Sequence, residues 1–362
     1  MKSRMLTLAA AVLAVALEAR AESGYWDRSV GDFPRLADES DDSPRLQRAV
    51  DACRGGVLFV PAGEYHLTKT LAITNFCSVL MHRNARLRAA RPMDFVVRVN
   101  FSPVFSAYEK LDYGTFFKGG CVDGDGIASC MSVHGYIHLT LRDLQFHNGR
   151  KFGLRIKGEE GPGGGELNAS NLHFVNKSKG NAGNIAVEVN GCDDNLTDCW
   201  TCDYTVGFKV TGCNNYLTRC HSWGGVIGSV DGEMPEYLKD SVGFWIFGGN
   251  NTVLRDCYAD TATTGFLLNG WETRIFGATY LYNTGCLKGV KRDNLDVVRA
   301  FRQTDGNALV IGADIISPKL PGFEVYEGTG NTKFSDMIYA GMHTPRNTPA
   351  RCVMRIDGGQ EL

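Results

Sequence analysis

Aromatic, histidine and acidic residues recur at one place in successive repeats of this sequence. Side chains of a strand alternate between its two faces, so the residues flanking an inward position point outward. Two outward positions per repeat collect side chains suited to contact a ligand: His173, Trp200, His221, Trp223, Tyr258 and Asp260. Sugar rings stack on aromatic faces, and histidine and aspartate bond hydroxyl groups. The pattern predicts a groove that binds a polysaccharide. A subunit interface is the alternative, which leaves a homo-oligomer open.

A long insertion beside this groove carries candidate catalytic groups. Most repeats pass from the second outward position to the next strand in five residues, but the chain takes 20 residues from Trp223 to Gly243. Glycoside hydrolysis needs a proton donor and a second carboxylate that acts as base or nucleophile. The insertion and the repeats would supply one each. The four carboxylates predicted to be catalytic are Asp231, Glu233, Asp203 and Asp260.

Two other functions stay open beside hydrolysis. β-Elimination of a uronate needs a base, for which Lys239 or His221 is a candidate, and charge neutralisation by calcium or by Arg219. Lys239 is also expected to bind substrate. The second alternative is a non-catalytic protein that binds glycan or serves as a structural module. Hydrolysis is favoured narrowly. A hydrolase would require no cofactor, and calcium is a possible cofactor for a lyase. No metal ligands are assigned.

These residues lie on a repeat with an uninterrupted period of 21 residues, from Gly191 to Gly212. The segments "NLTDCWTCDYTVGFKVTG", "NNYLTRCHSW" with "SVGFWIFGG", and "NNTVLRDCYADTATTGFLLNG" place three cysteines in register: Cys199, Cys220 and Cys257. Short alternating segments between turns, without a helical stripe, are typical of stacked β coils. We predict an all-β parallel β-helix with three strands per coil. The cysteine column should face inward and stay reduced, because its parallel Cβ vectors suit a disulfide poorly.

The N-terminal region has two further features. Residues 1–21 have a basic start, an apolar run and Ala19-Arg20-Ala21, which predicts a signal peptide and a secreted or periplasmic protein. Within a cap region at 22–66, Asp42 or Ser43 can begin a helix over about 44–53 with Pro44 in its first turn. This helix would cover the open end of a β-helix over 67–345, which a tail over 346–362 follows.

The segments "DDSPRLQRAVDAC", "GGVLFVPAGEYHL" and "GGCVDGDG" resemble the N-terminal part of the pectate-lyase-like superfamily. The resemblance covers roughly residues 32–285 and implies a right-handed parallel β-helix. That superfamily includes lyases, hydrolases, epimerases and phage tailspikes, so the resemblance leaves the chemistry open. Acidic pairs found in some members are missing from the matching turns "TVGF", "SVGF" and "TTGF". Arg155 and Lys157, in "GLRIKG", are expected to form a solvated charged face beside Glu188 and Lys209.

Composition limits the partners and the use of cysteine. The formal net charge is −2 and no basic run occurs, so no nucleic-acid partner is expected. Beyond the N-terminal segment, no apolar run is long enough to span a membrane. All twelve cysteines follow the predicted signal peptide. Cys121 and Cys130 are the pair most easily bridged locally, although spacing alone does not fix connectivity.

Overall fold

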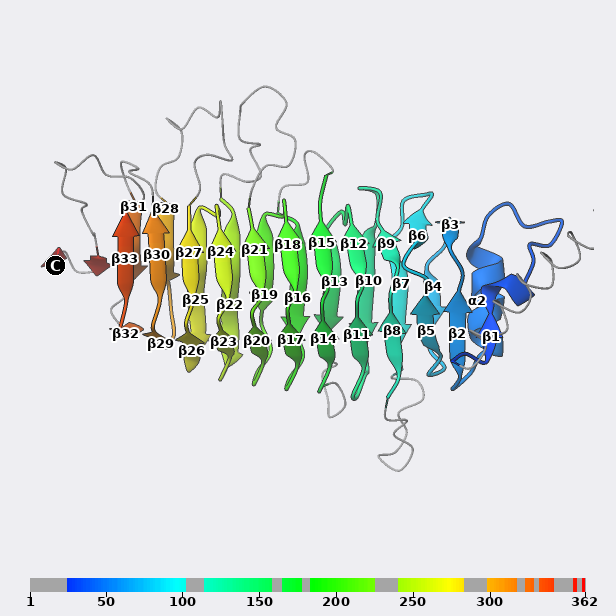
Figure 1. Cartoon of the computed structure of the whole chain (residues 1–362), viewed down its shortest axis with the longest axis horizontal. Helices are drawn as coiled ribbons and strands as arrows, with labels where there is room; N and C mark the ends of the chain where they lie inside the picture. Colours follow the sequence, from blue (N-terminus) through cyan, green and yellow to red (C-terminus); the bar gives the residue numbers. More distant parts are fainter. Residues whose placement is uncertain are drawn as a thin grey trace, which may run out of the picture.

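The chain forms a stack of coils, each with three short strands that belong to three parallel sheets (Figure 1). The structure is a computed structural model that describes residues 25–101, 114–157, 165–177, 183–224, 240–282, 298–317, 323–328, 332–341, 354–356 and 360–361. In these ranges the sheets contain 12, 11 and 12 strands, named here sheets A, B and C. The paired strands are parallel, apart from the C-terminal pair β34 and β35. The predicted parallel β-helix is confirmed.

The strands of each sheet follow one another along the stack. Sheet A comprises β1 (Arg28–Ser29), β2 (Val57–Val60), β5 (Ser78–Met81), β8 (Phe116–Lys118), β11 (Thr140–Arg142), β14 (Asn168–Ser170), β17 (Asn195–Thr197), β20 (Tyr216–Thr218), β23 (Val253–Arg255), β26 (Thr273–Phe276), β29 (Ala308–Ile311) and β32 (Thr332–Ser335). Sheet B comprises β3 (Gly63–Leu67), β6 (Ala85–Ala89), β9 (Cys121–Asp123), β12 (Gln145–His147), β15 (His173–Val175), β18 (Trp200–Cys202), β21 (His221–Trp223), β24 (Tyr258–Asp260), β27 (Thr279–Leu281), β30 (Asp314–Ser317) and β33 (Ile338–Gly341). Sheet C comprises β4 (Leu71–Ile73), β7 (Phe95–Asn100), β10 (Ser129–His134), β13 (Phe152–Lys157), β16 (Ile185–Asn190), β19 (Val206–Val210), β22 (Val242–Asn250), β25 (Thr264–Trp271), β28 (Val298–Gln303), β31 (Phe323–Gly328), β34 (Met354–Ile356) and β35 (Gln360–Glu361).

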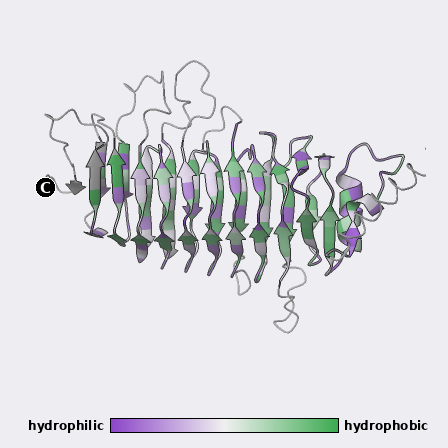
Figure 2. Cartoon of the chain, in the orientation of Figure 1, coloured by the Kyte–Doolittle hydropathy of each residue, from purple (hydrophilic) through white to green (hydrophobic). Residues whose placement is uncertain are grey.

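The core is a set of inward columns, one side chain per coil. On sheet C the rings of Phe208, Phe244, Phe266 and Phe301 stack with centroids 5.0–5.1 Å apart. Each ring is fully buried, which contributes roughly 1.5–3 kcal/mol per side chain relative to exposure. Hydrophobic segments recur from coil to coil in Figure 2. The period-2 alternation seen in the sequence therefore records which face of each strand meets the core.

The glycine before each of several inward phenylalanines is required by close packing between sheets B and C. A Cβ on Gly207 would lie 2.1 Å from Oγ of Ser222 and 2.7 Å from the carbonyl oxygen of Gly243. A Cβ on Gly265 would lie 2.3 Å from the ring of Tyr280. The recurring Gly-Phe pair thus combines close approach at the corner with a large side chain in the core.

From β11 onward, the turns from sheet A to sheet B contain one residue each in the left-handed region. Asp and Asn tolerate this conformation, and glycine adopts it freely. Arg219 (φ 50°) is the exception, and its guanidinium forms two hydrogen bonds to Asp198, at 2.7 and 2.8 Å. The members in chain order are Asp143, Asn171, Asp198, Arg219, Asp256, Gly277, Gly312 and Asp336. Arg219 therefore pairs with its neighbouring turn, which argues against the role in elimination expected for it.

Helix α2 (Ser43–Ala52) covers the N-terminal end of the stack, after a short 3₁₀ helix η1 (Val30–Asp32) (Figure 1). Its buried face includes Leu46, Ala49 and Val50, as predicted. Gln47 bonds both backbone groups of Ala72, at 2.9 and 3.0 Å, on the edge strand β4. The helix thus covers apolar surface and satisfies part of an exposed strand edge.

The coil boundaries differ from the expected ones. Strand β2 begins at Val57, ahead of residue 67, because it already pairs with β5 in sheet A. Within the expected tail, Met354–Ile356 forms β34 beside β31. The predicted signal peptide at 1–21 lies outside the described residues.

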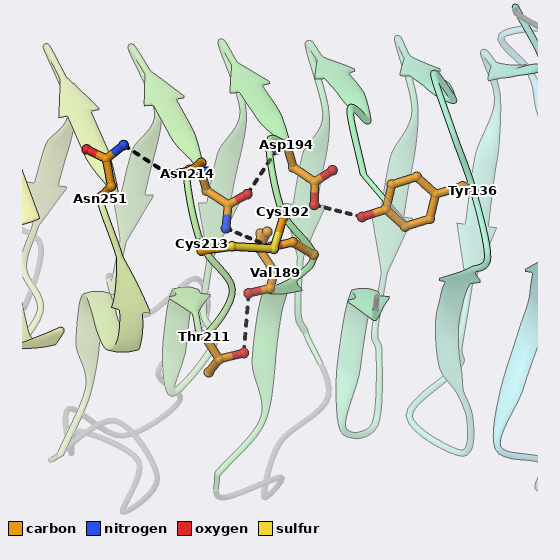
Figure 3. The surroundings of a disulfide bond; sticks show 10 residues. Tyr136, Val189, Cys192, Asp194, Thr211, Cys213, Asn214 and Asn251 are labelled. Carbon is orange, nitrogen blue, oxygen red and sulfur yellow. Dashed lines mark hydrogen bonds between the residues drawn. A yellow bond between two sulfur atoms is a disulfide. The ribbon is translucent and has the colours of Figure 1, made fainter. Parts of the chain in front are cut away.

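The cysteines within the described ranges divide into eight free thiols and one disulfide. Cys199, Cys220 and Cys257 are free and at most 1% exposed, as the inward column predicts. Cys121 and Cys130 are also free, so the expected local bridge is absent. The disulfide joins Cys192 and Cys213, whose Cα atoms lie 4.7 Å apart in neighbouring coils (Figure 3). This bridge was not predicted.

Candidate functional site

The five predicted aromatic and histidine side chains line the outer face of sheet B. Strands β15, β18, β21 and β24 pair in register, so the column His173, Trp200, His221, Tyr258 runs over four successive coils. Trp223 lies beside Asp260 in the second outward column. We call the following set the aromatic strip: His173, Trp200, His221, Trp223 and Tyr258.

The rings of the aromatic strip contact one another. His221 stacks on Tyr258 with centroids 4.4 Å apart and planes 13° apart. Trp200 contacts both Trp223, at 6.4 Å, and the edge of His173, at 5.9 Å. His173 is exposed and the other four are half-buried. The strip is therefore a continuous aromatic surface that solvent reaches.

Two ring nitrogens of the strip have unmet hydrogen-bonding capacity. Nε2 of His221 and Nε1 of Trp223 are inaccessible to solvent and have no hydrogen-bond partner within the described part of the chain. A buried polar atom without a partner costs roughly 1–3 kcal/mol. Burial lowers the pKa of His221, and the nearby carboxylate of Asp260 opposes this shift. A neutral imidazole at neutral pH can both donate and accept a hydrogen bond.

Asp260 is the coil carboxylate closest to these nitrogens in the strand register. Its Oδ2 accepts a hydrogen bond from the hydroxyl of Tyr258 at 3.1 Å, and its Oδ1 accepts one from the hydroxyl of Thr261. A carboxylate that already accepts from two hydroxyls is oriented to accept a further proton or hydrogen bond. This geometry suits a base or a binding group better than a proton donor.

Asp203 has a different environment. It is 2% exposed, follows β18 with φ 59°, and its amide donates to the carbonyl of Trp223 at 3.2 Å. Its carboxylate bonds the thiol of Cys202, whose pKa is raised mainly by burial. This position lies beneath the strip, which argues against direct contact with a substrate. Asp260 remains the better coil carboxylate.

The remaining predicted residues, Asp231, Glu233 and Lys239, lie outside the described residues. The ends of their insertion are described, since it leaves β21 and enters β22. A second, shorter insertion leaves β15 and enters β16. Both insertions therefore run from sheet B to sheet C and leave the same corner of the coil.

A second surface, on the outer face of sheet C, was missed from the sequence. A cleft of about 410 Å³ crosses β7, β10 and β13. Arg98 lies over the ring of Phe95, and Arg155 lies over the ring of Phe152, with the two rings 6.2 Å apart. Its lining residues are Asp94, Phe95, Arg98, Asn100, Ser129, His134, Lys151, Phe152 and Arg155.

The charge of this cleft is only partly compensated. Arg155 pairs with Glu188 at 2.7 Å, and Glu188 also pairs with Lys209 at 3.2 Å, so the expected charged face is an ion-pair network. Arg98 and Lys151 form no ion pair with any residue that the structure describes. The cleft is therefore cationic and aromatic, which suits a carboxylate-bearing sugar. The strand register of sheet C aligns Arg98 with Ser132 and Arg155. Knowledge of this register would have indicated the cleft.

Neither a metal-binding cluster nor a membrane-spanning helix occurs in the described ranges. In the described ranges, no group of three or more His, Cys, Asp or Glu side chains could hold a metal ion. No helix in the same ranges is long and apolar enough to cross a membrane.

Comparison with known proteins identifies the fold. No protein-family model matches the sequence, and no curated protein matches it. Among solved structures, endo-xylogalacturonan hydrolase from Aspergillus tubingensis aligns over 90% of this chain and 99% of its own, with TM-score 0.60 and 13% identity. A double mutant of the tailspike protein of E. coli bacteriophage HK620 aligns over 91% of this chain and 64% of its own, with TM-score 0.64 and 13% identity. The chain has the right-handed parallel β-helix fold of these structures.

A third similar structure is that of PfbA, a surface adhesin of Streptococcus pneumoniae. It aligns over 86% of this chain and 89% of its own, with TM-score 0.58 and 10% identity. At such identities the likeness concerns the fold alone, because one β-helix can support unrelated activities. The function of this chain must be argued from its own side chains.

Proposed function

We propose that this protein is an exported enzyme that cleaves glycosidic bonds in a polysaccharide lying along the aromatic strip. The observation that carries the proposal is the alignment of five rings over four coils, in which His173, Trp200 and Trp223 form one contacting group and His221 and Tyr258 another, with two ring nitrogens near Asp260 that lack a partner among the described residues. Coils repeat at about 4.8 Å, so the strip can follow an extended chain rather than one small ligand. Export rests on the predicted signal peptide.

Hydrolysis is the reaction we favour. Asp260 would accept a proton from water or contact the sugar directly, since both of its oxygens already act as acceptors. The proton donor would be Asp231 or Glu233 from the insertion that begins after β21. Retaining and inverting enzymes differ in carboxylate separation, so the stereochemistry of the product would report the distance between these groups.

β-Elimination of an acidic polysaccharide is the second candidate, and the cationic cleft favours it. Arg98 and Lys151 line the cleft on sheet C, so they would bind uronate carboxylates away from the reacting residue, where His221 or Lys239 would act as base. A neutral His221 is competent for this role because burial lowers its pKa. Calcium would be tested as a requirement of this reaction, with no site assigned to it.

The experiment follows reducing ends and the ultraviolet absorbance of unsaturated uronates on neutral and acidic polysaccharides. Reducing ends without absorbance indicate hydrolysis, and both together indicate elimination. The variants are Trp223→Ala for binding and Asp260→Asn for catalysis. Tyr216→Ala is the matched control, because Tyr216 is an exposed aromatic residue on sheet A, away from the strip.

We expect Trp223→Ala to weaken binding about tenfold or more, which corresponds to about 1.4 kcal/mol. Asp260→Asn should lower turnover about a hundredfold or more, as loss of a proton-transfer group does. Tyr216→Ala should leave both unchanged. Full activity in both strip variants would place the site elsewhere, and binding without cleavage would support the non-catalytic alternative.

A further inference from the structure

Two buried thiols meet where the capping helix contacts the first coil. Cys53 is the C-cap residue of α2 and is 3% exposed. Cys77 directly precedes β5 and is 1% exposed. Both belong to the main hydrophobic core, where the thiols lie close enough for each to influence the pKa of the other. The thiol of Cys77 donates to the carbonyl of Ser78 at 3.5 Å. They belong to different elements, one to the cap and the other to the β-helix.

The backbone around this pair is fixed on both sides. The amide of Gly55 donates to the carbonyl of Asn75 at 3.1 Å, and the amide of Ser78 donates to the carbonyl of Gly56 at 2.9 Å. The side chain of Asn75 donates to the carbonyl of Val50, in α2, at 2.8 Å. These bonds flank both cysteines and hold their backbones at a constant separation.

The pair differs from the cysteine column in the core. Cys199, Cys220 and Cys257 occupy equivalent positions of successive coils, so their Cβ vectors are nearly parallel, and Cys220 contacts both neighbours. Cys53 and Cys77 approach across an interface between unlike elements. A disulfide requires Cβ atoms roughly 3.5–4.5 Å apart, and the stacking of equivalent coil positions does not force the Cβ vectors of this pair to be parallel.

We propose that Cys53 and Cys77 form a disulfide when the protein folds in an oxidising compartment. Two thiols lose two electrons and two protons to a disulfide oxidant of the glutathione type, which is reduced to two thiols as the Sγ–Sγ bond forms. The bond joins α2 covalently to the first coil. This inference is independent of the proposed enzymatic function.

The disulfide would restrict opening of the cap. It closes a loop of about 25 residues, and cross-linking such a loop disfavours the open state by a factor on the order of 100. Burial raises the pKa of both thiols, so little thiolate is available once α2 has docked. The bond should therefore form during folding, whereas protein folded under reducing conditions should react slowly.

The test compares full chain that folded during export with full chain made in a reducing cytosol. Free thiols are alkylated in denaturant, and peptides are mapped by mass spectrometry without reduction. We expect a Cys53–Cys77 linked peptide in the exported protein and alkylated residues in the cytosolic protein. Alkylation of both cysteines in the exported protein, or pairing of either with another cysteine, would overturn the proposal.

Hydrogen exchange measures whether the disulfide restricts opening of α2. Amides of α2 should exchange on the order of 100-fold more slowly in the exported protein than after reduction. Amides of β26 and β29, far from both disulfides along the stack, provide the matched control and should not change. Equal exchange of α2 in the two redox states would show that the bond does not hold the cap.

Discussion

Asp194 lies in the turn from sheet C to sheet A with a fully buried carboxyl group (Figure 3). Its Oδ2 accepts from the hydroxyl of Tyr136 at 2.7 Å, and its Oδ1 accepts from the amide of Leu167 at 2.9 Å. Burial raises the pKa of Asp194 to about 7, and the hydrogen bonds from Tyr136 and Leu167 limit the shift. The perturbation we choose is Asp194→Asn, which keeps the shape and removes the charge.

The magnitude follows from proton linkage. The folded state binds the proton of Asp194 more tightly than the unfolded state, whose pKa is about 3.9. The stability that this group contributes is therefore complete below pH 4 and is lost as pH rises to about 7. A difference of about three pKa units corresponds to about 4 kcal/mol. The free energy of unfolding of Asp194→Asn, minus that of the wild type, should increase by up to this amount between pH 4 and pH 8.

Urea unfolding of both proteins at a series of pH values measures this difference, with equal m-values as the check that the states compared are the same. Asp193→Asn is the matched control, since Asp193 is exposed in the same turn, and it should not reproduce the change. Tyr136→Phe removes a bond that favours the carboxylate, so the inflection should move to higher pH. A pH-independent difference for Asp194→Asn would refute the reasoning.

Three further predictions concern packing, cysteine chemistry and charge. Gly207→Ala should destabilise the protein by about 2 kcal/mol in thermal or urea unfolding, because its Cβ would overlap Ser222. Gly31→Ala is the control and should have little effect, because its Cβ would meet nothing nearer than 3.4 Å. Thiol titration in denaturant should find Cys199, Cys220 and Cys257 reduced, and a mapped disulfide between any two would contradict the inward column. Arg98→Gln should weaken binding of acidic oligosaccharides and flatten its salt dependence, while unchanged binding at low salt would remove the cleft from the proposed site.

The fold could be predicted because every coil requires the same kinds of residue at the same positions. Inward positions need apolar side chains, the corner into sheet C needs a small residue, and the turn into sheet B needs one that tolerates positive φ. These requirements recur at matching places in each repeat, so Cys199, Cys220 and Cys257 were correctly placed in one inward column. The helix at Ser43–Ala52 was predictable for the same kind of reason, since Pro44 and its apolar face are local signals.

The candidate site was predictable only in part. The aromatic strip follows from strand alternation, whereas the cleft depends on lateral contacts between side chains of β7, β10 and β13. The disulfide shows another limit: Cys192 and Cys213 are 21 residues apart, and Cys199 and Cys220 have the same spacing. Spacing therefore showed that both pairs are neighbours, but not which pair has the backbone geometry to bond.

The 21-residue coil between Gly191 and Gly212 makes the length of this molecule adjustable. Its strands β17, β18 and β19 pair without register shifts with the coils before and after them. Removing one such unit would join two surfaces of the same shape and shorten the stack by about 4.8 Å. Duplicating it would add one more aromatic rung. Adding or removing whole coils would therefore change, in fixed steps, how many sugar units the surface can contact.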